Sequence, residues 1–349
     1  MKTIAAVLVE TGRPLELADL EVPKLKPGQV FVEIAFSGVC HTQLLECRGY
    51  RGADPFLPHC LGHEASGIVI DTGADVTKCC VDDQVILSWI KGSGADVPGS
   101  VYDWNGKKVN AGGVTTFMAH AVVSENRVTV LGEGVSLEVA SLVGCAGATG
   151  AGAVWNAAGV RPSEIVAVFG TGGVGLCAVA AAVQAKADTV IAVDVHPVRL
   201  ALAKQLGADI VINASKADPV EQIRAAFPTG IDHSIEASGR PSVMRQALAC
   251  VRARGGQAVV IGNARFGESL EIDPRELNQG KRLIGTWGGD CEPDRDFAKI
   301  SRLSVEGSLP LERLIGQHYS LEEMNEALAD LETGDVARPL LDMTRKSPE

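Results

Sequence analysis

Several features are missing from the 349-residue sequence, and each absence excludes a class of protein. The net charge of the chain is −11, and the sequence has no stretch rich in lysine and arginine. Both observations argue against a nucleic-acid partner or an anionic membrane surface. The N-terminal segment MKTIAAVLVETGRPLEL lacks the long apolar stretch and small-residue cleavage site of a secretory leader. The 39 glycines follow no Gly-x-y period, so they predict tight turns and close backbone approaches rather than a collagen helix.

Cysteine usage indicates the redox compartment. Nine cysteines stand at irregular positions, and an odd number without a leader argues against a disulfide framework. We expect reduced thiols in a cytoplasmic enzyme, some of them metal ligands.

Two long uncharged runs, 139–160 and 165–185, reach the length of about 20 residues that a membrane span needs. Both are rich in glycine, which is not typical of a helix surrounded by lipid. Each run instead predicts a fully buried parallel strand followed by a closely packed helix. We therefore expect no membrane partner.

The pattern of apolar residues changes once along the chain. Residues 1–130 contain short apolar runs separated by Pro and Gly turns and predict a β-rich domain. From about Arg161 strands and helices alternate, which predicts a doubly wound parallel sheet. After about Gly285 the alternation weakens, and a helix over Leu321–Leu331 precedes a last strand over Pro339–Met343.

A glycine turn between the first predicted strand and helix of the second region indicates a dinucleotide site. Residues 170–175 read G-x-G-x-x-G, and Asp194 ends the next predicted strand. This spacing lets a pyrophosphate approach the backbone at the helix N-terminus while the carboxylate of Asp194 accepts hydrogen bonds from both ribose hydroxyls. A 2′-phosphate would meet that negative charge, so we expect NAD rather than NADP. The alternative for Asp194 is a solvated carboxylate at a strand end. The residues assigned to this turn are Gly170, Gly172, Gly173, Val174 and Gly175.

The β-rich region carries a possible metal site. Cys40, His63 and Cys145 together form the two-cysteine, one-histidine set of a catalytic zinc site, which leaves the fourth position for substrate. The alternative for a buried cysteine is a small inert hydrophobic side chain, and we assign that role to the other seven.

The motifs together resemble a known family. G-V-C-H-T (38–42), L-G-H-E-A (61–65), G-C-A-G-A-T-G-A-G-A (144–153), V-F-G-T-G-G-V-G-L (168–176) and V-D (193–194) occur in that order. They resemble the zinc-dependent medium-chain alcohol dehydrogenases, nearest the class III (glutathione-dependent formaldehyde dehydrogenase) branch. The similarity runs from about Lys2 to Met343.

The resemblance implies an α/β protein with a GroES-like β-rich catalytic domain (1–147 and 287–349) around a Rossmann NAD-binding domain (148–286). It implies that Cys40, His63 and Cys145 bind one catalytic zinc, beside which Glu64 lies as a neighbour or transient ligand. It also implies hydride transfer between an alcohol and NAD, with the products an aldehyde or ketone and NADH.

Further residue roles follow from the same resemblance. Thr42 falls on the hydroxyl that passes the alcohol proton towards the nicotinamide ribose, and His41 is a second exit for that proton. Arg338 matches a pyrophosphate-binding arginine, and Arg199 matches a basic residue near the adenosine ribose. Trp89 matches an aromatic wall of the substrate pocket. The alternatives are solvated arginines and an ordinary core tryptophan.

The sequence departs from the family at three places. The segment 88–117 is short and has no cysteine where the family has four for a structural zinc, so we expect a single zinc per chain. The arginine that class III enzymes use for the glutathione adduct has no counterpart, which argues against glutathione-linked formaldehyde oxidation. Gln43 replaces an aspartate that hydrogen-bonds the zinc-ligand histidine, and Leu45 replaces a relay histidine.

Two other functions compete with this hypothesis. One is a zinc-independent NAD(P)H reductase of alkenes or quinones from the same superfamily, and the other is a catalytically silent NAD-binding homologue. Metal content and NADH production separate them.

The sequence says less about the substrate and the oligomeric state than about the metal and dinucleotide sites. Trp89 narrows the inner pocket while the shortened segment opens or reshapes its mouth, and primary alcohols, aromatic ones included, are the expected substrates. We expect a homodimer formed by edge-strand pairing near Ala258–Gly262, with a tetramer as the alternative.

Overall fold

The computed structural model describes residues 1–334 and 336–345. The chain divides into two units, one made of Met1–Cys145, Glu292–Val305 and Leu311–Glu349, the other of Ala146–Cys291 and Glu306–Pro310. Each unit is described by itself. Within the described residues no helix is both long enough and apolar enough to cross a bilayer.

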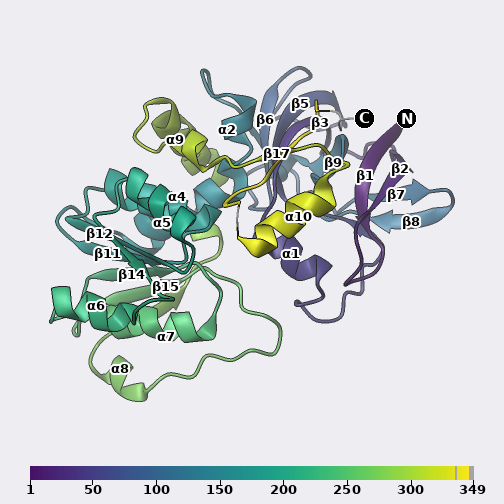
Figure 1. The fold of residues 1–349 in the computed structure, drawn as a ribbon. Helices are drawn as coiled ribbons and strands as arrows, with labels where there is room; N and C mark the ends of the chain where they lie inside the picture. Colours follow the sequence, from purple (N-terminus) through teal and green to yellow (C-terminus); the bar gives the residue numbers. More distant parts are fainter. Residues whose placement is uncertain (335, 346–349) are drawn as a thin grey trace. The chain divides into compact units, whose positions relative to one another are not determined.

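The first unit is built from β-structure, as its short apolar runs predict (Figure 1). A closed barrel has the strand order β1-β2-β7-β8-β4, and a second sheet has the order β10-β6-β5-β3-β18-β17 with β9 also paired to β3. The strands are β1 Lys2–Leu8, β2 Glu16–Glu21, β3 Gln29–Gly38, β4 His59–Cys60, β5 Glu64–Thr72, β6 Gln84–Ser88, β7 Val101–Trp104, β8 Lys107–Asn110, β9 His120–Ser124, β10 Val128–Val130, β17 His318–Tyr319 and β18 Leu340–Asp342. The helices are α1 His41–Cys47, α2 Leu137–Ala140, α9 Pro293–Val305 and α10 Met324–Thr333.

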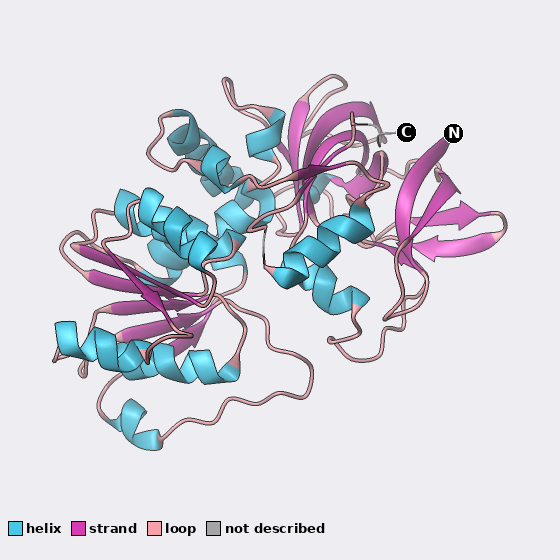
Figure 2. Ribbon diagram, in the orientation of Figure 1, coloured by secondary structure: helices cyan, strands magenta, loops and turns pink. Residues whose placement is uncertain are grey.

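The second unit is a parallel sheet with helices on both faces (Figure 2). Its strand order is β13-β12-β11-β14-β15-β16; α4 and α5 pack together, and so do α6 and α7. The strands are β11 Ile165–Phe169, β12 Thr189–Asp194, β13 Ile210–Asn213, β14 His233–Glu236, β15 Gln257–Val260 and β16 Arg282–Gly285. The helices are α3 Ala148–Gly152, α4 Gly173–Gln184, α5 Pro197–Gln205, α6 Pro219–Ala226, α7 Pro241–Cys250 and α8 Pro274–Asn278.

Strand order creates the crevice of this unit. The chain runs from β11 outwards through β12 to β13 and then returns to β14 on the other side of β11. Loops that leave the carboxyl ends of β11 and β14 therefore diverge, and dinucleotides bind at such a point in doubly wound sheets. The core under the crevice is apolar and includes Phe169, Ile191 and Ala258.

Two expectations about this unit are wrong. The run 139–160 contains no strand, because it forms α2, two π-helical segments (Val143–Gly147 and Ala153–Ala158) and α3 between them. The run 165–185 is the predicted strand and helix. The edge pairing expected near Ala258–Gly262 also fails, because β15 is hydrogen-bonded to β14 on one side and to β16 on the other. Among the described strands, the edges of the sheet are β13 and β16.

Candidate metal and dinucleotide sites

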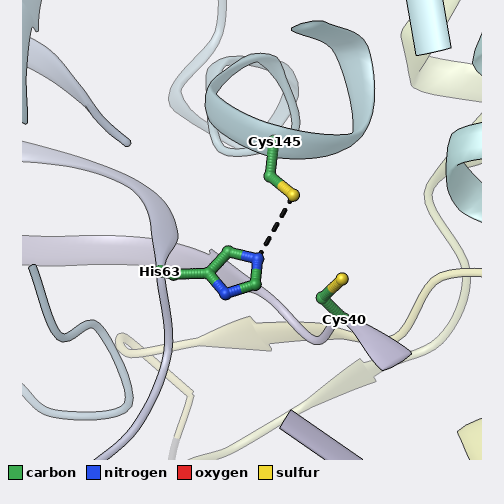
Figure 3. Close-up of side chains that lie close together, drawn as sticks. All are labelled: Cys40, His63 and Cys145. Carbon is green, nitrogen blue, oxygen red and sulfur yellow. Dashed lines mark hydrogen bonds between the residues drawn. The ribbon is translucent and has the colours of Figure 1, made fainter. Parts of the chain in front are cut away.

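The structure brings Cys40, His63 and Cys145 together from three distant parts of the first unit (Figure 3). Their ligand atoms all lie within 4.8 Å of one another, and His63 Nε2 is 3.2 Å from Cys145 Sγ. Zinc binds sulfur at about 2.3 Å and imidazole nitrogen at about 2.0 Å, so one ion can contact all three atoms. The donor set and its geometry therefore fit zinc.

Glycines beside the ligands allow this convergence. Gly62 precedes His63 with φ 89°, and a Cβ there would lie 2.3 Å from Thr116 Oγ1. Gly144 precedes Cys145 and packs so closely on β6 that a Cβ would lie 2.4 Å from the Leu87 carbonyl oxygen. Cys145 itself lies in the π-helical segment Val143–Gly147, and π-helical turns are frequent at functional sites.

Gln43 connects two members of the group. Its Oε1 accepts a hydrogen bond from the Cys40 backbone N–H at 3.0 Å, and its Nε2 contacts His63 Nδ1. A neutral amide in contact with Nδ1 is placed to orient the imidazole, and this role stays a prediction. If zinc binds His63 Nε2, the proton of the ring lies on Nδ1, and that N–H needs a hydrogen-bond acceptor. The Gln43 side chain can offer its oxygen to Nδ1 only if the amide turns away from the Cys40 N–H.

Electrostatics separate Cys40 from the packing cysteines. Hydrogen bonding by Cys145, opposed by burial and assisted by His63 and the charge of Arg338, holds the pKa of the Cys40 thiol well below its usual range. Burial instead raises the pKa of Cys47 and of Cys60 to about 12. The thiolate is the form of cysteine that binds metals. The lowered pKa therefore suits Cys40 to be a ligand, whereas the raised pKa keeps Cys47 and Cys60 protonated and unreactive.

The remaining residues expected near the metal lie in the same unit. Thr42 Oγ1 is 3.9 Å from Cys40 Sγ, and His41 is exposed at the start of α1. The ring of Trp89 lies edge-on to His63 with centroids 6.4 Å apart. Glu64 is fully buried and forms an ion pair with Arg338, a contact that the sequence did not predict.

The glycine turn of the second unit has the expected geometry. Gly170 follows β11 with φ 87°, and a Cβ at Gly175 would lie 1.8 Å from the Gly170 carbonyl oxygen. A Cβ at Gly172 would meet nothing within 4 Å, so the turn is open where a pyrophosphate approaches. Gly173 and Val174 begin α4, whose N-terminal amides favour an anion. The turn fits a dinucleotide.

Asp194 is not a solvated carboxylate. It is 8% exposed, and its Oδ2 accepts hydrogen bonds from the backbone N–H and the hydroxyl of Thr171 at 2.6 and 3.0 Å. Its Oδ1 accepts from the backbone N–H groups of Val195 and His196. The carboxylate thus ties β12 to the glycine turn. Arg199 is half-buried on α5, five residues further on.

One buried acid of the same crevice was missed. Glu236 ends β14 with no exposed surface, and its Oε1 accepts hydrogen bonds from the backbone N–H groups of Ser238 and Gly239 at 2.7 and 2.9 Å. Burial raises the pKa of this carboxyl, although those donors oppose the shift. An acid that ends a strand two residues before a Ser-Gly pair is the signal that could have identified it.

Comparisons with known proteins identify the family of this chain. Residues 26–133 match the alcohol dehydrogenase GroES-like domain, and residues 173–306 match the zinc-binding dehydrogenase family. The chain is 34% identical to an S-(hydroxymethyl)glutathione dehydrogenase of Synechocystis sp. over 98% of this chain and 100% of the relative. The crystal structure of benzyl alcohol dehydrogenase from Acinetobacter calcoaceticus superposes with a TM-score of 0.89 at 31% identity, covering 98% and 99% of the two chains. An alcohol dehydrogenase zinc-binding domain protein from Burkholderia ambifaria gives 0.91, also at 31%, with the same coverage.

The chain therefore belongs to the zinc-dependent alcohol dehydrogenase family, with the GroES-like and NAD-binding domains of that family. Its full-length relatives include S-(hydroxymethyl)glutathione dehydrogenases at 32–34% identity.

Proposed function

We propose that this protein oxidises an alcohol to an aldehyde or ketone with NAD, using one zinc ion bound by Cys40, His63 and Cys145. The convergence of these three ligand atoms is the observation that carries the proposal. Zinc supplies Lewis acidity that lowers the pKa of a bound alcohol hydroxyl. Within the described residues no second group of three or more histidine, cysteine or acidic side chains is placed to hold a metal, which supports a single ion per chain.

The chain's own residues have separate tasks. Thr42 lies beside the ligand group and takes the alcohol proton, with His41 as a second exit. Gln43 orients His63, and Trp89 forms a wall next to that histidine. The glycine turn and the N-terminus of α4 hold the pyrophosphate. Asp194 selects the ribose hydroxyls of NAD over the 2′-phosphate of NADP, and Arg199 lies on the helix that follows.

The proposed assembly and location follow the family. We take the catalytic domain as 1–147 and 287–349, the NAD-binding domain as 148–286, and the protein as a cytoplasmic homodimer. The described sheet edge at β16 replaces the β15 segment as the pairing strand, because β15 has strands on both sides.

The test is metal analysis followed by turnover. Protein purified with zinc should hold one ion per chain and reduce NAD in the presence of an alcohol. Cys40→Ala and His63→Ala should lose zinc and turnover but keep NAD binding, because the glycine turn belongs to a different part of the chain. Turnover without metal would favour the zinc-independent reductase, and NAD binding without turnover of any alcohol would favour the silent homologue.

A further inference from the structure

Glu236 is a buried acid to which the proposed function assigns no task. It ends β14 and has no exposed surface. Its Oε1 accepts hydrogen bonds from the backbone N–H and the hydroxyl of Ser238 at 2.7 and 2.5 Å, and from the backbone N–H of Gly239 at 2.9 Å. The side chain therefore holds the loop that leaves its own strand.

The other oxygen of this carboxyl group lies against a second loop. Glu236 Oε2 is buried and has no hydrogen-bond partner among the described residues. A Cβ on Gly262 would lie 2.9 Å from it, so Oε2 packs on the backbone of the loop that follows β15. One carboxyl group thus bonds to the loop after β14 and packs on the loop after β15.

These two loops and the glycine turn pack together at the carboxyl edge of the sheet. A Cβ at Gly170 would lie 2.9 Å from Ser238 N, and a Cβ at Gly262 would lie 2.1 Å from Gly239 N. A Cβ at Gly239, whose φ is 72°, would lie 2.3 Å from the Asn263 carbonyl oxygen. Because the loop after β14 touches backbone on both sides, it cannot shift without displacing its neighbours.

The three packed segments belong to both halves of the dinucleotide site. In doubly wound sheets each half of the sheet binds one nucleotide, and the halves meet where the strand order reverses. The glycine turn after β11 and Asp194 at the end of β12 suit the pyrophosphate and the adenosine ribose. The loops after β14 and β15, on the other side of β11, therefore belong to the nicotinamide half.

We infer that Glu236 is a positioning residue for the nicotinamide half of NAD, because it fixes the loops after β14 and β15 on which that half would bind. This inference rests on the proposed NAD-linked function and adds a residue to it. Glu236 acts through Ser238 and Gly239, since its side chain has no surface for a cofactor to contact. Hydride transfer needs the reacting groups held within about 0.5 Å of the productive geometry, so a small loop shift matters.

The experiment compares two ligands that share the adenosine half. Dissociation constants of NADH and AMP are measured on the full-length, zinc-loaded protein. Glu236→Leu removes the acceptor for the loop after β14, so NADH affinity should fall about tenfold, the effect of losing one or two hydrogen bonds, while AMP affinity stays unchanged. Glu236→Gln keeps an acceptor oxygen and should restore most of the NADH affinity.

Two results would overturn the inference. One is an equal change, or no change, in the affinities for NADH and AMP in Glu236→Leu, because the residue would then not act on the nicotinamide half. The other is a loss of NADH affinity in Glu236→Gln as large as in Glu236→Leu, because the amide still offers the oxygen that Ser238 and Gly239 need.

A matched control separates positioning from general stability. Asp232 directly precedes the opposite end of β14 and accepts a hydrogen bond from the Ile165 backbone N–H at 2.9 Å. Asp232→Leu should therefore keep the wild-type ratio of NADH to AMP affinity, and a ratio altered as in Glu236→Leu would contradict the inference. The binding comparison needs no turnover. Failure to oxidise any alcohol would contradict the proposed function, while the NADH and AMP affinities would still decide the role of Glu236.

Discussion

Arg338 and Glu64 form an ion pair in the interior of the first unit, where their exposed fractions are 3% and 0%. Family resemblance assigns the two residues to different partners, the arginine to a pyrophosphate and the glutamate to the metal surroundings. The structure joins them, and the charge of Arg338 also helps to lower the pKa of Cys40. The buried guanidinium of Arg338 thus neutralises the charge of Glu64 and also helps to lower the pKa of the Cys40 thiol.

Breaking this pair should destabilise the protein strongly. Glu64→Ala or Arg338→Ala leaves one charge buried without its partner, which costs about 3–5 kcal/mol in the free energy of unfolding. The double variant Glu64→Leu/Arg338→Met should lose much less than the sum of the single variants, because neither charge remains. Urea unfolding measures all of these, and additive losses would show that the pair is not coupled.

Replacing Gln43 by glutamate should strengthen zinc binding. A carboxylate accepts from the Cys40 N–H and from a protonated His63 Nδ1 at the same time, whereas the amide must turn to do so. We expect Gln43→Glu to hold zinc about tenfold more tightly and Gln43→Leu to hold it about 10–100-fold less tightly. Competition with a chromogenic chelator at fixed pH measures both. Equal zinc affinity in the two variants would contradict a role for this side chain.

Asp194 should control the choice between NAD and NADP. Asp194→Ala removes the acceptor for Thr171 and the charge that repels a 2′-phosphate. We expect kcat/KM for NAD to fall by about 10–100-fold and the NADP/NAD ratio to rise. Asp209→Asn is the control, because Asp209 also accepts a backbone N–H of β12, from Val190, at the opposite end of the strand. The prediction fails if both variants change the ratio alike.

Glu125 should make stability sensitive to acid. Burial raises its pKa, but hydrogen bonds from the backbone N–H groups of Ala95, Thr77 and Lys78 outweigh burial and hold the pKa below its ordinary value. The unfolded chain therefore binds the proton more readily, so the stabilisation is present above about pH 4.3 and is lost as the pH falls below it.

The measurement is the urea midpoint of wild type and Glu125→Gln between pH 7 and pH 3. The variant should be less stable at pH 7, and the difference should shrink on acidification. A difference that is constant with pH would show that the carboxylate charge is not what stabilises the loops at 77–78 and 95.

Local sequence patterns predicted much of the second unit. The expected alternation of strands and helices from about Arg161 is observed from β11 to β16, and the expected glycine turn lies between β11 and α4. These elements depend on neighbouring residues, on apolar runs and on glycine. The run 139–160 was assigned wrongly because uninterrupted apolar residues fit a buried strand and a buried helix equally well.

Long-range contacts were harder to predict. The metal ligands were proposed from their residue types and from the family motifs, not from their spacing, because Cys40, His63 and Cys145 are far apart in sequence. The strand near Ala258–Gly262 was expected at the edge of the sheet, but β16 pairs with it and forms the edge instead. Which strand lies at an edge depends on the order of all strands in the sheet.

The sequence by itself determined the ligand types, the glycine turn and the absence of cysteines for a structural zinc, because these are properties of single residues and of their immediate neighbours. Only the tertiary structure decided that Arg338 faces Glu64 and that Gln43 bridges Cys40 and His63. Such contacts arise when distant segments close-pack. Their energies depend on burial and on partner geometry, which a linear pattern does not contain.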